Sequence, residues 1–354
     1  MTIFDRIASQ FKLQTPFVVY RKPNENMISG FFQQTKEVFF VEDYTKSGFI
    51  FSPFDNQEKA ILIPENKSEY HQEALVLEEM PVVETKKISE DASSKKIHLQ
   101  LVNKAIQEIK KKHFQKVVVS RREEVPLSNF MLVESFRKIL HTYPNAFGYV
   151  WFHPTIGLWM GATPETLLSI SENRFNTMSL AGTQVYTDSK EVVWESKELE
   201  EQALVTSFIT SQIKEIAVNL KISEKETIRA GNLLHLKTHI SGEILNGKDH
   251  LKALISALHP TPAVCGFPRL ATKKFISKNE NYQRTFYTGF LGELNIAPQN
   301  IGSKKTTLFV NLRCMEIKKK QALLYVGGGI TKDSNALKEW EETVSKSAVM
   351  KAVL

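Results

Sequence analysis

Short apolar runs recur along this chain of 354 residues, and polar turns rather than regularly spaced helices join them. Residues 17–20, 38–41, 116–121 and 147–152 each gather β-branched and aromatic side chains over a length typical of a strand. Further runs of this kind are residues 157–160, 307–313 and 322–326. A doubly wound parallel sheet would place a helix between successive strands, and that alternation is missing. The sequence therefore predicts an α+β fold made of strand meanders and a few long helices.

Three segments carry the apolar spacing that is typical of amphipathic helices. They are residues 97–109, residues 196–220 and the C-terminal segment, for which Asp333 or Ser334 is the candidate N-cap. The glycine run 327–329 stands between a strand and this last helix. It predicts a tight turn, or a turn whose backbone N–H groups hold an anion. The polar segment 84–94 is the predicted linker or exposed loop.

The composition is that of a globular protein, with 42% hydrophobic and 24% charged residues. The two cysteines, Cys265 and Cys314, are too few for a disulfide framework and favour a reducing compartment. No run has the length of a membrane span, and the N-terminal residues lack the apolar core of a signal peptide, so we expect a cytoplasmic protein. The net charge of +7 comes from dispersed lysines, which favours a solvated surface or an anionic small substrate over nucleic acid.

Two glutamate pairs, each spaced i, i+3 on a predicted helix, carry the main chemical signal: Glu198/Glu201 and Glu339/Glu342. Residues three apart share a helix face. Four carboxylates brought together by folding would form an all-oxygen site for a hard divalent cation, and Mg²⁺ fits such a site best. This pattern suggests an enzyme that acts on an anionic substrate.

Taken alone, the two pairs differ in strength. Glu198 and Glu201 continue the apolar stripe of their helix, where a bare carboxylate is costly unless it is paired or bound to metal. A pair at a helix start that the dipole stabilises is the alternative. Glu342 points away from the apolar face of its own helix, with Lys346 one turn later, which by itself indicates a surface salt bridge.

Other catalytic patterns are weak or missing in this sequence. His235 lies in an apolar segment, which is typical of a core histidine satisfied by hydrogen bonding. No His/Cys spacing indicates zinc. The sequence contains no Gly-x-Ser-x-Gly nucleophile elbow, and both cysteines read as small buried hydrophobes.

The order and wording of nine short motifs resemble the chorismate-utilising enzymes, which include isochorismate synthase, salicylate synthase, the large subunit of anthranilate synthase and aminodeoxychorismate synthase. The resemblance covers residues 95–354, whereas residues 1–94 match only in general character as a variable, strand-rich part. The motifs are KVVVSR (116–121), GATPE (161–165), LAGT (180–183), KELEEQALV (197–205), HPTPAVCGFP (259–268), FYTGFLG (286–292), NLRC (311–314), GGGI (327–330) and EWEETVSK (339–346).

The resemblance implies one α+β domain over residues 1–354, in which two packed antiparallel sheets are flanked by helices around a central active-site cleft. It implies that both glutamate pairs converge on one Mg²⁺, with Glu201 and Glu342 nearest to the metal and Glu198 and Glu339 completing the shell. Arg313 would hold the enolpyruvyl carboxylate of chorismate, because a guanidinium fork suits a carboxylate. The other positions that the resemblance assigns to substrate binding are Ala181, Gly182, Thr183, His235, the segment Thr261-Pro262-Ala263, Tyr287, Leu312, Tyr325, Gly327, Gly328 and Lys346.

Two positions indicate water rather than ammonia as the nucleophile. Lys116 stands where the isochorismate and salicylate enzymes carry their general base, and anthranilate synthases lack a lysine there. Ala181 stands where aminodeoxychorismate synthases carry a nucleophilic lysine. The resemblance thus implies isochorismate synthase, an isomerase in which Lys116 activates water for attack at C2 and Glu165 protonates the departing C4 hydroxyl. A lysine base needs a lowered pKa, and a glutamic acid donor needs a raised one.

Several alternatives stay open. Salicylate synthase, which eliminates pyruvate from isochorismate in the same pocket, is the nearest, followed by an anthranilate-type aminating enzyme with a glutaminase partner. A basic nucleic-acid-binding protein would leave the glutamate pairs unexplained. For the favoured function we expect a monomer that binds chorismate, with no nucleic-acid, membrane or glutaminase partner, and a product used for menaquinone or siderophore biosynthesis. The loop after Thr183 and Cys314 receive no role.

Overall fold

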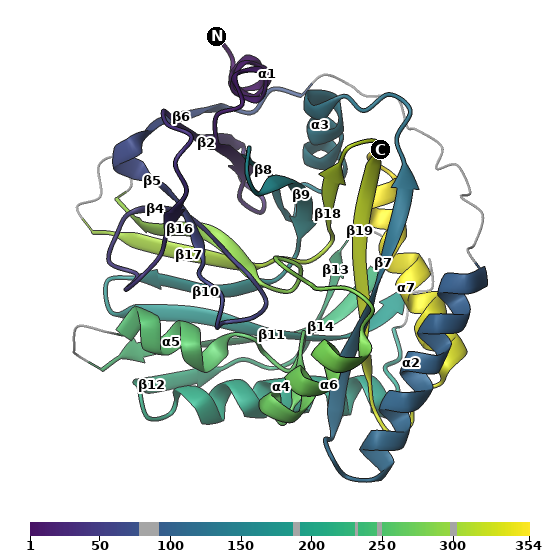
Figure 1. Cartoon of the computed structure of the whole chain (residues 1–354). Coiled ribbons are helices and arrows are strands. Elements are labelled where there is room, and N and C mark those ends of the chain that lie inside the picture. The colour runs from purple at the N-terminus through teal and green to yellow at the C-terminus, as the bar shows by residue number, and fades with distance from the viewer. Residues whose placement is uncertain (78–91, 187–191, 231–232, 246–249, 298–302) are drawn as a thin grey trace.

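A computed structural model of the chain describes residues 1–77, 92–186, 192–230, 233–245, 250–297 and 303–354. Two large sheets form its body, and every strand pairing between described residues is antiparallel (Figure 1). The α+β class that the apolar pattern predicts and the two antiparallel sheets that the resemblance implies are both confirmed. None of the helices in the described ranges is both long enough and apolar enough to cross a membrane.

The first sheet has nine strands. In spatial order they are β15 (Gly266–Phe267), β7 (Lys116–Pro126), β19 (Gln321–Ile330), β18 (Cys314–Lys318), β9 (Gly157–Thr163), β8 (Phe147–His153), β1 (Phe17–Arg21), β2 (Met27–Gln33) and β6 (Ser68–Ala74).

The second sheet has ten strands. In spatial order they are β12 (Ala217–Ile222), β14 (Leu233–Ile244), β11 (Arg174–Val185), β10 (Thr166–Ser171), β17 (Lys305–Val310), β16 (Phe290–Ile296), β4 (Gly48–Ser52), β5 (Ile61–Pro64) and β3 (Phe39–Phe40), with β13 (Glu226–Ala230) also paired to β14. Strands from the first 74 residues thus belong to both sheets.

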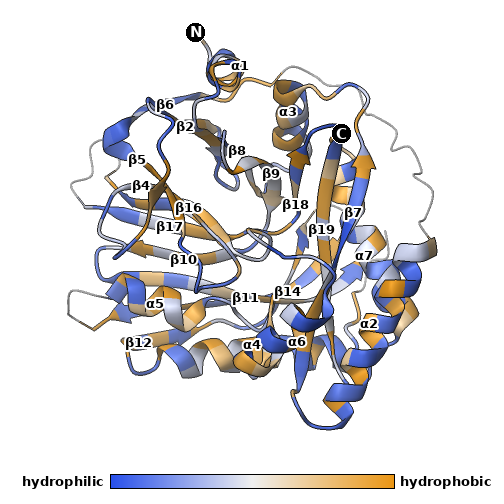
Figure 2. Cartoon of the chain, in the orientation of Figure 1, coloured by the Kyte–Doolittle hydropathy of each residue, from blue (hydrophilic) through white to orange (hydrophobic). Residues whose placement is uncertain are grey.

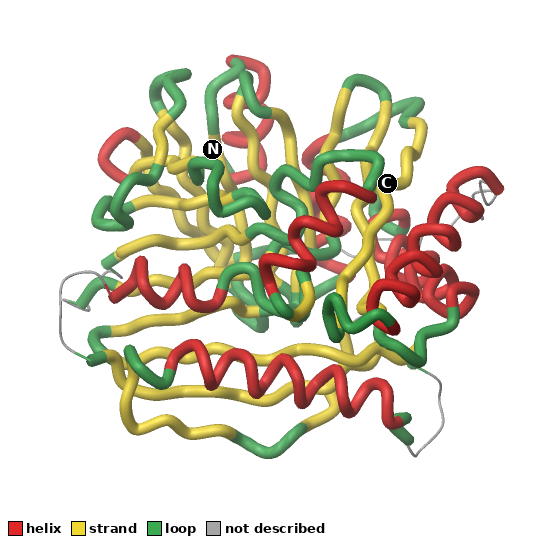
Figure 3. The backbone as a smooth tube through the Cα atoms, turned by 60° about the horizontal axis from the view of Figure 1, so that its bottom comes forward, coloured by secondary structure: helices red, strands yellow, loops and turns green. Residues whose placement is uncertain are grey.

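The helices lie outside the two sheets, and Figure 3 shows some of them covering the lower sheet of Figure 1 and running roughly along its strands. Figure 2 shows hydrophilic and hydrophobic residues mixed along α2 and α4, as expected for helices with one buried face. The described helices are α1 (Ile3–Leu13), the single 3₁₀ turn η1 (Glu65–Lys67), α2 (Ala92–Lys110), α3 (Leu132–Thr142), α4 (Ser196–Ile213), α5 (His250–Leu258), α6 (Arg269–Asn279) and α7 (Ala336–Lys351).

Aromatic side chains fill the space between the two sheets. Phe147 of β8 stacks on Phe309 of β17 with ring centroids 4.1 Å apart, and Tyr20 of β1 lies 5.1 Å from Phe49 of β4. All four are buried. Full burial of such a side chain contributes about 1.5–3 kcal/mol, so this layer fixes the separation of the sheets.

Two of the crossovers at which the chain passes from one sheet to the other lie next to each other. At Pro164 and Glu165 it leaves β9 of the first sheet for β10 of the second, and at residues 311–313 it leaves β17 of the second sheet for β18 of the first. Backbone hydrogen bonds join the crossovers, from Val310 N to the Glu165 carbonyl and from Ala162 N to the Arg313 carbonyl, each 3.0 Å long. The predicted strand 307–313 therefore ends at Val310, because the next three residues cross between the sheets.

Two other expectations from the sequence are wrong in detail, and a third is tested only in part. The predicted helix 196–220 ends at Ile213, because residues 217–222 pair with β14 as the edge strand β12, and this pairing overrides the helical spacing. The last helix is capped by Asn335, whose side chain accepts hydrogen bonds from the backbone N–H groups of Leu337 and Lys338, rather than by Asp333 or Ser334. Of the predicted linker, residues 84–91 lie outside the described ranges, and 92–94 begin α2.

The glycine run is not a turn. Gly327 to Gly329 continue β19 and pair with residues 118–120 of β7. A Cβ on Gly329 would come within 1.9 Å of Glu201 Oε1, so the glycines are needed here for close approach of other groups to the strand rather than for a bend.

A fully buried ion pair ties β7 to the rest of the fold. Arg284 Nη2 lies 2.6 Å from Glu280 Oε1, and the Glu280 carboxylate also accepts hydrogen bonds from the backbone N–H and the hydroxyl of Ser120. The Arg284 guanidinium donates to the carbonyls of Val118 and Val264. This ion pair thus holds together β7, through Ser120 and Val118, and the segment that contains Val264.

Replacing Arg284 by methionine should lower the free energy of unfolding by about 3–5 kcal/mol, because the Glu280 carboxylate would stay buried without its partner. Arg122→Met is the matched control, since Arg122 and Glu124 form a 2.9 Å ion pair at the surface, where such pairs contribute about 0–1 kcal/mol. Urea unfolding of the two variants measures the difference. Equal losses would contradict the role given to Arg284.

Candidate active site

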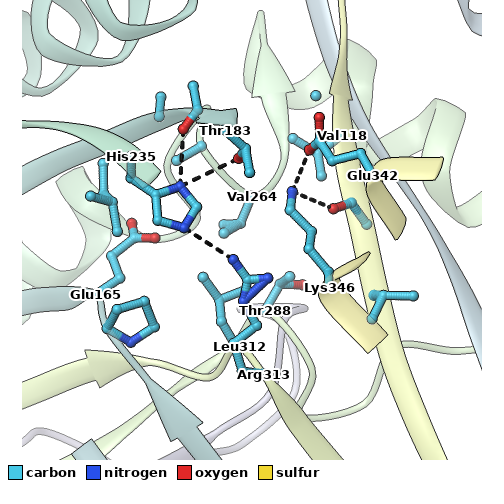
Figure 4. A pocket seen from close by; sticks show the side chains of 18 of the residues that line it. Val118, Glu165, Thr183, His235, Val264, Thr288, Leu312, Arg313, Glu342 and Lys346 are labelled. Atoms are coloured by element: carbon cyan, nitrogen blue, oxygen red, sulfur yellow. Dashed lines mark hydrogen bonds and ion pairs between the residues drawn. The ribbon is translucent and has the colours of Figure 1, made fainter. Parts of the chain in front are cut away.

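The two crossovers, the glycine part of β19 and the start of β7 surround one cavity (Figure 4). Most of the residues that the sequence assigned to the site line it. They are Lys116, Glu165, Ala181, Gly182, Thr183, Glu201, His235, Ala263, Tyr287, Leu312, Arg313, Tyr325, Gly327, Glu342 and Lys346.

The other assigned positions do not line this cavity. Glu198 and Glu339 line an adjoining hollow, which shares Glu342 and Thr183 with the cavity. Gly328 belongs to β19, and a Cβ there would lie 3.3 Å from Glu339 Oε2. Thr261 and Pro262 are buried beside Ala263 without reaching the cavity.

The sequence reasoning missed several lining residues, namely Val118, Pro164, Leu180, Val264, Thr288, Val326 and Gly329. All of them except Val326 belong to the motifs quoted above. The motifs therefore located the cavity, and only the choice of single residues within them was incomplete. Gly329 matters most among them, because any side chain there would displace Glu201.

Lys116 is the first residue of β7 and is almost fully buried. Its Nζ lies 3.0 Å from Glu201 Oε1 of α4. An ammonium at this depth needs a counter-ion, and Glu201 supplies it. Glu165, from the crossover between β9 and β10, lines the same cavity.

Glu165 has the electrostatics of a proton donor. It is 3% exposed, and burial raises the pKa of its carboxyl to about 8, although the charges of Lys116 and Arg313 act in the opposite direction. The carboxyl is therefore mostly protonated at neutral pH. This agrees with the raised pKa that an acid in this position requires.

Arg313 enters the cavity from the crossover between β17 and β18. Its backbone is left-handed, with a φ of 47°, and the bond from Ala162 N to its carbonyl holds that conformation. Arg313 Nη2 lies 3.2 Å from His235 Nε2, and His235 Nδ1 lies 2.9 Å from the Gly182 carbonyl (Figure 4). Burial and the Arg313 charge lower the pKa of His235 to about 3, so the ring is neutral.

Three lysines pair with three of the four glutamates. Besides the Lys116–Glu201 pair, Lys197 Nζ lies 2.5 Å from Glu339 Oε1, and Lys346 Nζ lies 2.5 Å from Glu342 Oε1. Lys346 also donates to the Gly327 carbonyl over 2.9 Å. The salt bridge that α7 alone suggested for Glu342 therefore exists, but in the cavity wall rather than at the surface.

The glutamates fit a hard cation in chemistry, although no three His, Cys, Asp or Glu side chains of the described residues lie close enough to form a metal site by themselves. Glu198 Oε2 and Glu339 Oε2 are buried without a hydrogen-bond partner. Burial raises the pKa of both carboxyls, and the Glu342 charge adds to the rise at Glu339. Burial acts the same way on Glu342, but Lys346 and Lys197 outweigh it and hold that pKa below its usual range. Two buried carboxylate oxygens without partners, one of them beside Gly328, are what a divalent cation could satisfy.

Comparison with known proteins gives a family. A family model described as "Chorismate binding enzyme" matches residues 49–354. The chain belongs to the chorismate binding enzymes. The resemblance read from the motifs is thereby confirmed, and so is its fold.

Relatives within and around this family agree with that placement. Isochorismate synthase DhbC of Bacillus subtilis is 29% identical over 200 residues, which are 54% of this chain and 49% of that protein. The chain thus spans about half the length of this curated relative. In solved structures, a putative 2,3-dihydroxybenzoate-specific isochorismate synthase from Bacillus anthracis has a TM-score of 0.81 at 21% identity and covers 99% of both chains. The menaquinone-specific isochorismate synthase MenF of Escherichia coli also has a TM-score of 0.81, at 19% identity, over 100% of this chain and 91% of that one. At these identities the structures show the fold alone.

The raised pKa of Glu165 predicts a pH-dependent effect on stability. The folded-state pKa of about 8 lies above the unfolded value of 4.5, so Glu165 contributes stability that is complete below pH 4.5 and is lost as the pH rises through 8. Glu165→Gln stays neutral throughout. Relative to wild type, its free energy of unfolding should therefore rise by about 2–5 kcal/mol between pH 5 and pH 9, at about 1.4 kcal/mol per pKa unit.

Urea unfolding of both proteins across this pH range gives the comparison, and Glu172→Gln, in the exposed turn between β10 and β11, is the control. A difference between Glu165→Gln and wild type that is the same at pH 5 and pH 9 would show that Glu165 is not held neutral by the fold.

Proposed function

We propose that the chain is an isochorismate synthase, an isomerase that adds water at C2 of chorismate and removes the C4 hydroxyl. The observation that carries the proposal is a carboxyl group held neutral, Glu165, in the same buried cavity as Lys116 and a guanidinium, Arg313. A proton donor, a candidate base and a carboxylate anchor are the three groups that this reaction needs. The names of the relatives support the same activity.

The proton movements balance as follows. Lys116 first releases to solvent the ammonium proton that pairs it with Glu201. The neutral amine then takes a proton from water as the oxygen bonds to C2, and the ring double bonds shift. Glu165 gives its proton to the C4 hydroxyl, which leaves as water. Lys116 then returns its proton and Glu165 regains one through solvent, so the net reaction is an isomerisation.

The remaining residues bind and orient the substrate. Arg313 pairs with the enolpyruvyl carboxylate, since its fork of N–H groups matches two carboxylate oxygens. Tyr287 and Tyr325, whose rings stack with centroids 5.5 Å apart, give the cavity a wall against which the ring of the substrate can pack. Lys346 lies on the side of the cavity opposite Glu165 (Figure 4), where its ammonium could bind the second carboxylate of the substrate.

Mg²⁺ is the cofactor that we propose, held by Glu198, Glu201, Glu339 and Glu342, and when bound it would neutralise the ring carboxylate. The protein would act as a cytoplasmic monomer without a glutaminase, nucleic-acid or membrane partner. Its product would serve menaquinone or siderophore biosynthesis, since relatives named for 2,3-dihydroxybenzoate and for menaquinone share its fold.

Chromatographic separation of the products formed from chorismate and Mg²⁺ tests the reaction. We expect isochorismate, which has the mass of chorismate and must be resolved by retention time. Salicylate with free pyruvate would replace this proposal by a salicylate synthase, and a requirement for ammonia would replace it by an aminating enzyme.

Lys116→Ala and Glu165→Gln should each lower kcat by about 10²–10⁴-fold, the usual contribution of general acid–base catalysis. Lys104→Ala, on the exposed side of α2, is the control.

Glu198→Gln tests the cation site most cleanly, because no ion pair of Glu198 is formed within the described residues. Mg²⁺ that binds only the folded protein should raise the melting temperature of wild type, with about 2.7 kcal/mol of stabilisation at a concentration of 100 times Kd. The rise should be much smaller in Glu198→Gln and unchanged in Glu200→Gln, which removes an exposed carboxylate from the same helix. An equal rise in all three proteins would place the cation elsewhere.

A further inference from the structure

His235 lies on β14 and uses both of its ring nitrogens. Nδ1 lies 2.9 Å from the Gly182 carbonyl and 3.3 Å from Thr183 Oγ1, and Nε2 lies 3.2 Å from Arg313 Nη2 (Figure 4). The ring is 5% exposed. Its position between the backbone of one strand and the guanidinium therefore leaves little freedom to rotate.

The partners of the ring decide where its proton is. A guanidinium has only N–H donors, so Nε2 must accept from Arg313 through its lone pair. The Gly182 carbonyl can only accept, so Nδ1 must carry the proton and donate. An imidazolium would carry N–H groups on both nitrogens and would repel Arg313. The hydrogen bonds thus select the neutral ring with its proton on Nδ1.

The local backbone aims the Gly182 carbonyl at the ring. Gly182 has a φ of 76°, which is the left-handed region, and it lies in the irregularity where the pairing of β11 with β14 shifts between Ala181 and Gln184. A Cβ at Gly182 would also lie 3.1 Å from the Cβ of Glu198. A glycine at this position therefore serves the orientation of His235.

A neutral acceptor is the partner that suits a substrate-binding arginine. Within the described residues, Arg313 forms no ion pair. Its guanidinium makes a hydrogen bond to His235 Nε2. A carboxylate in place of the ring would hold the guanidinium more tightly, but it would cancel the charge that attracts an anion. The ring orients Arg313 and leaves both its charge and its other N–H groups for a ligand.

We propose that His235 is a positioning residue: its Nδ1–H form, fixed by Gly182, orients the Arg313 guanidinium for a substrate carboxylate and donates no proton in the reaction. The identity of that carboxylate rests on the proposed function, whereas the state of the ring does not. The other charged groups that face the ring are Lys346 and Glu342, and burial outweighs the Glu342 charge.

Nitrogen NMR of protein labelled with ¹⁵N-histidine reads the ring directly, without substrate. We expect His235 to show a protonated Nδ1 and an unprotonated Nε2, unchanged between pH 6 and pH 8, and its signals are assigned by their loss in either variant described below. A proton on Nε2, or a ring that becomes cationic in this range, would overturn the proposal. This readout stands even if the protein does not turn over chorismate.

Two variants separate the two hydrogen bonds. In His235→Gln, the amide oxygen of the new side chain can replace Nε2 as acceptor for Arg313, whereas the shorter side chain in His235→Asn can replace only the Nδ1–H donor. Loss of a hydrogen bond to a charged group should raise the KM for chorismate about 10–100-fold in His235→Asn, with kcat nearly unchanged. His235→Gln should recover most of that loss. A fall in kcat at constant KM in both variants would assign the ring to the chemistry, and equal KM values in the two variants would remove the positioning role.

Discussion

The two backbone hydrogen bonds between the crossovers are the constraint on which the rest of the site depends. They join Val310 to Glu165 and Ala162 to Arg313, each at 3.0 Å, where the chain changes sheets in opposite directions. Because the bonds are between main-chain atoms, they hold Glu165 and Arg313 near each other without using either side chain. If one sheet shifted relative to the other, Glu165 and Arg313 would move as a unit, because these bonds link their segments. The site is thus as rigid as the aromatic layer between the sheets, which stacks Phe147 on Phe309.

The charged groups that line the cavity have a net positive charge, which suits an anionic ligand. Lys116, Arg313 and Lys346 oppose the carboxylates of Glu201 and Glu342, while Glu165 is held neutral. A substrate with two carboxylates would bring two negative charges into a cavity that has one surplus positive charge. A cation that binds there must compete with the lysines for the same glutamate oxygens, so loading of the metal and release of the lysine pairs are linked.

How much of this the sequence could supply differs from residue to residue. The glutamate pairs were found because residues three apart share a helix face, and Lys116, Glu165 and Arg313 were found through motifs of the family. The glycine run was predicted as a turn because glycine permits bends, whereas the structure uses it to let Glu201 approach β19. The helix predicted to Leu220 ends at Ile213, because pairing with β14 is a long-range event that no local spacing records. The lysine partners of Glu201 and Glu339 were missed for the same reason, since only folding brings Lys116 and Lys197 against them. The Lys346 partner of Glu342 was found, because it lies one turn away on the same helix.

Burial has different consequences on the two sides of the cavity: ionisable groups are neutral on one side and charged on the other. Figure 4 shows Glu165, His235 and Arg313 on one side and Glu342 and Lys346 on the other. On the first side, desolvation keeps an acid and a base neutral, so Arg313 alone carries charge. On the second side, Lys346 and Lys197 keep Glu342 ionised despite the same desolvation. A dianion entering between them meets a proton donor and a single cation at one end and exchangeable ion pairs at the other. Because the two ends differ in kind rather than only in sign, the substrate proposed above would bind in one orientation, with the hydroxyl that leaves toward Glu165.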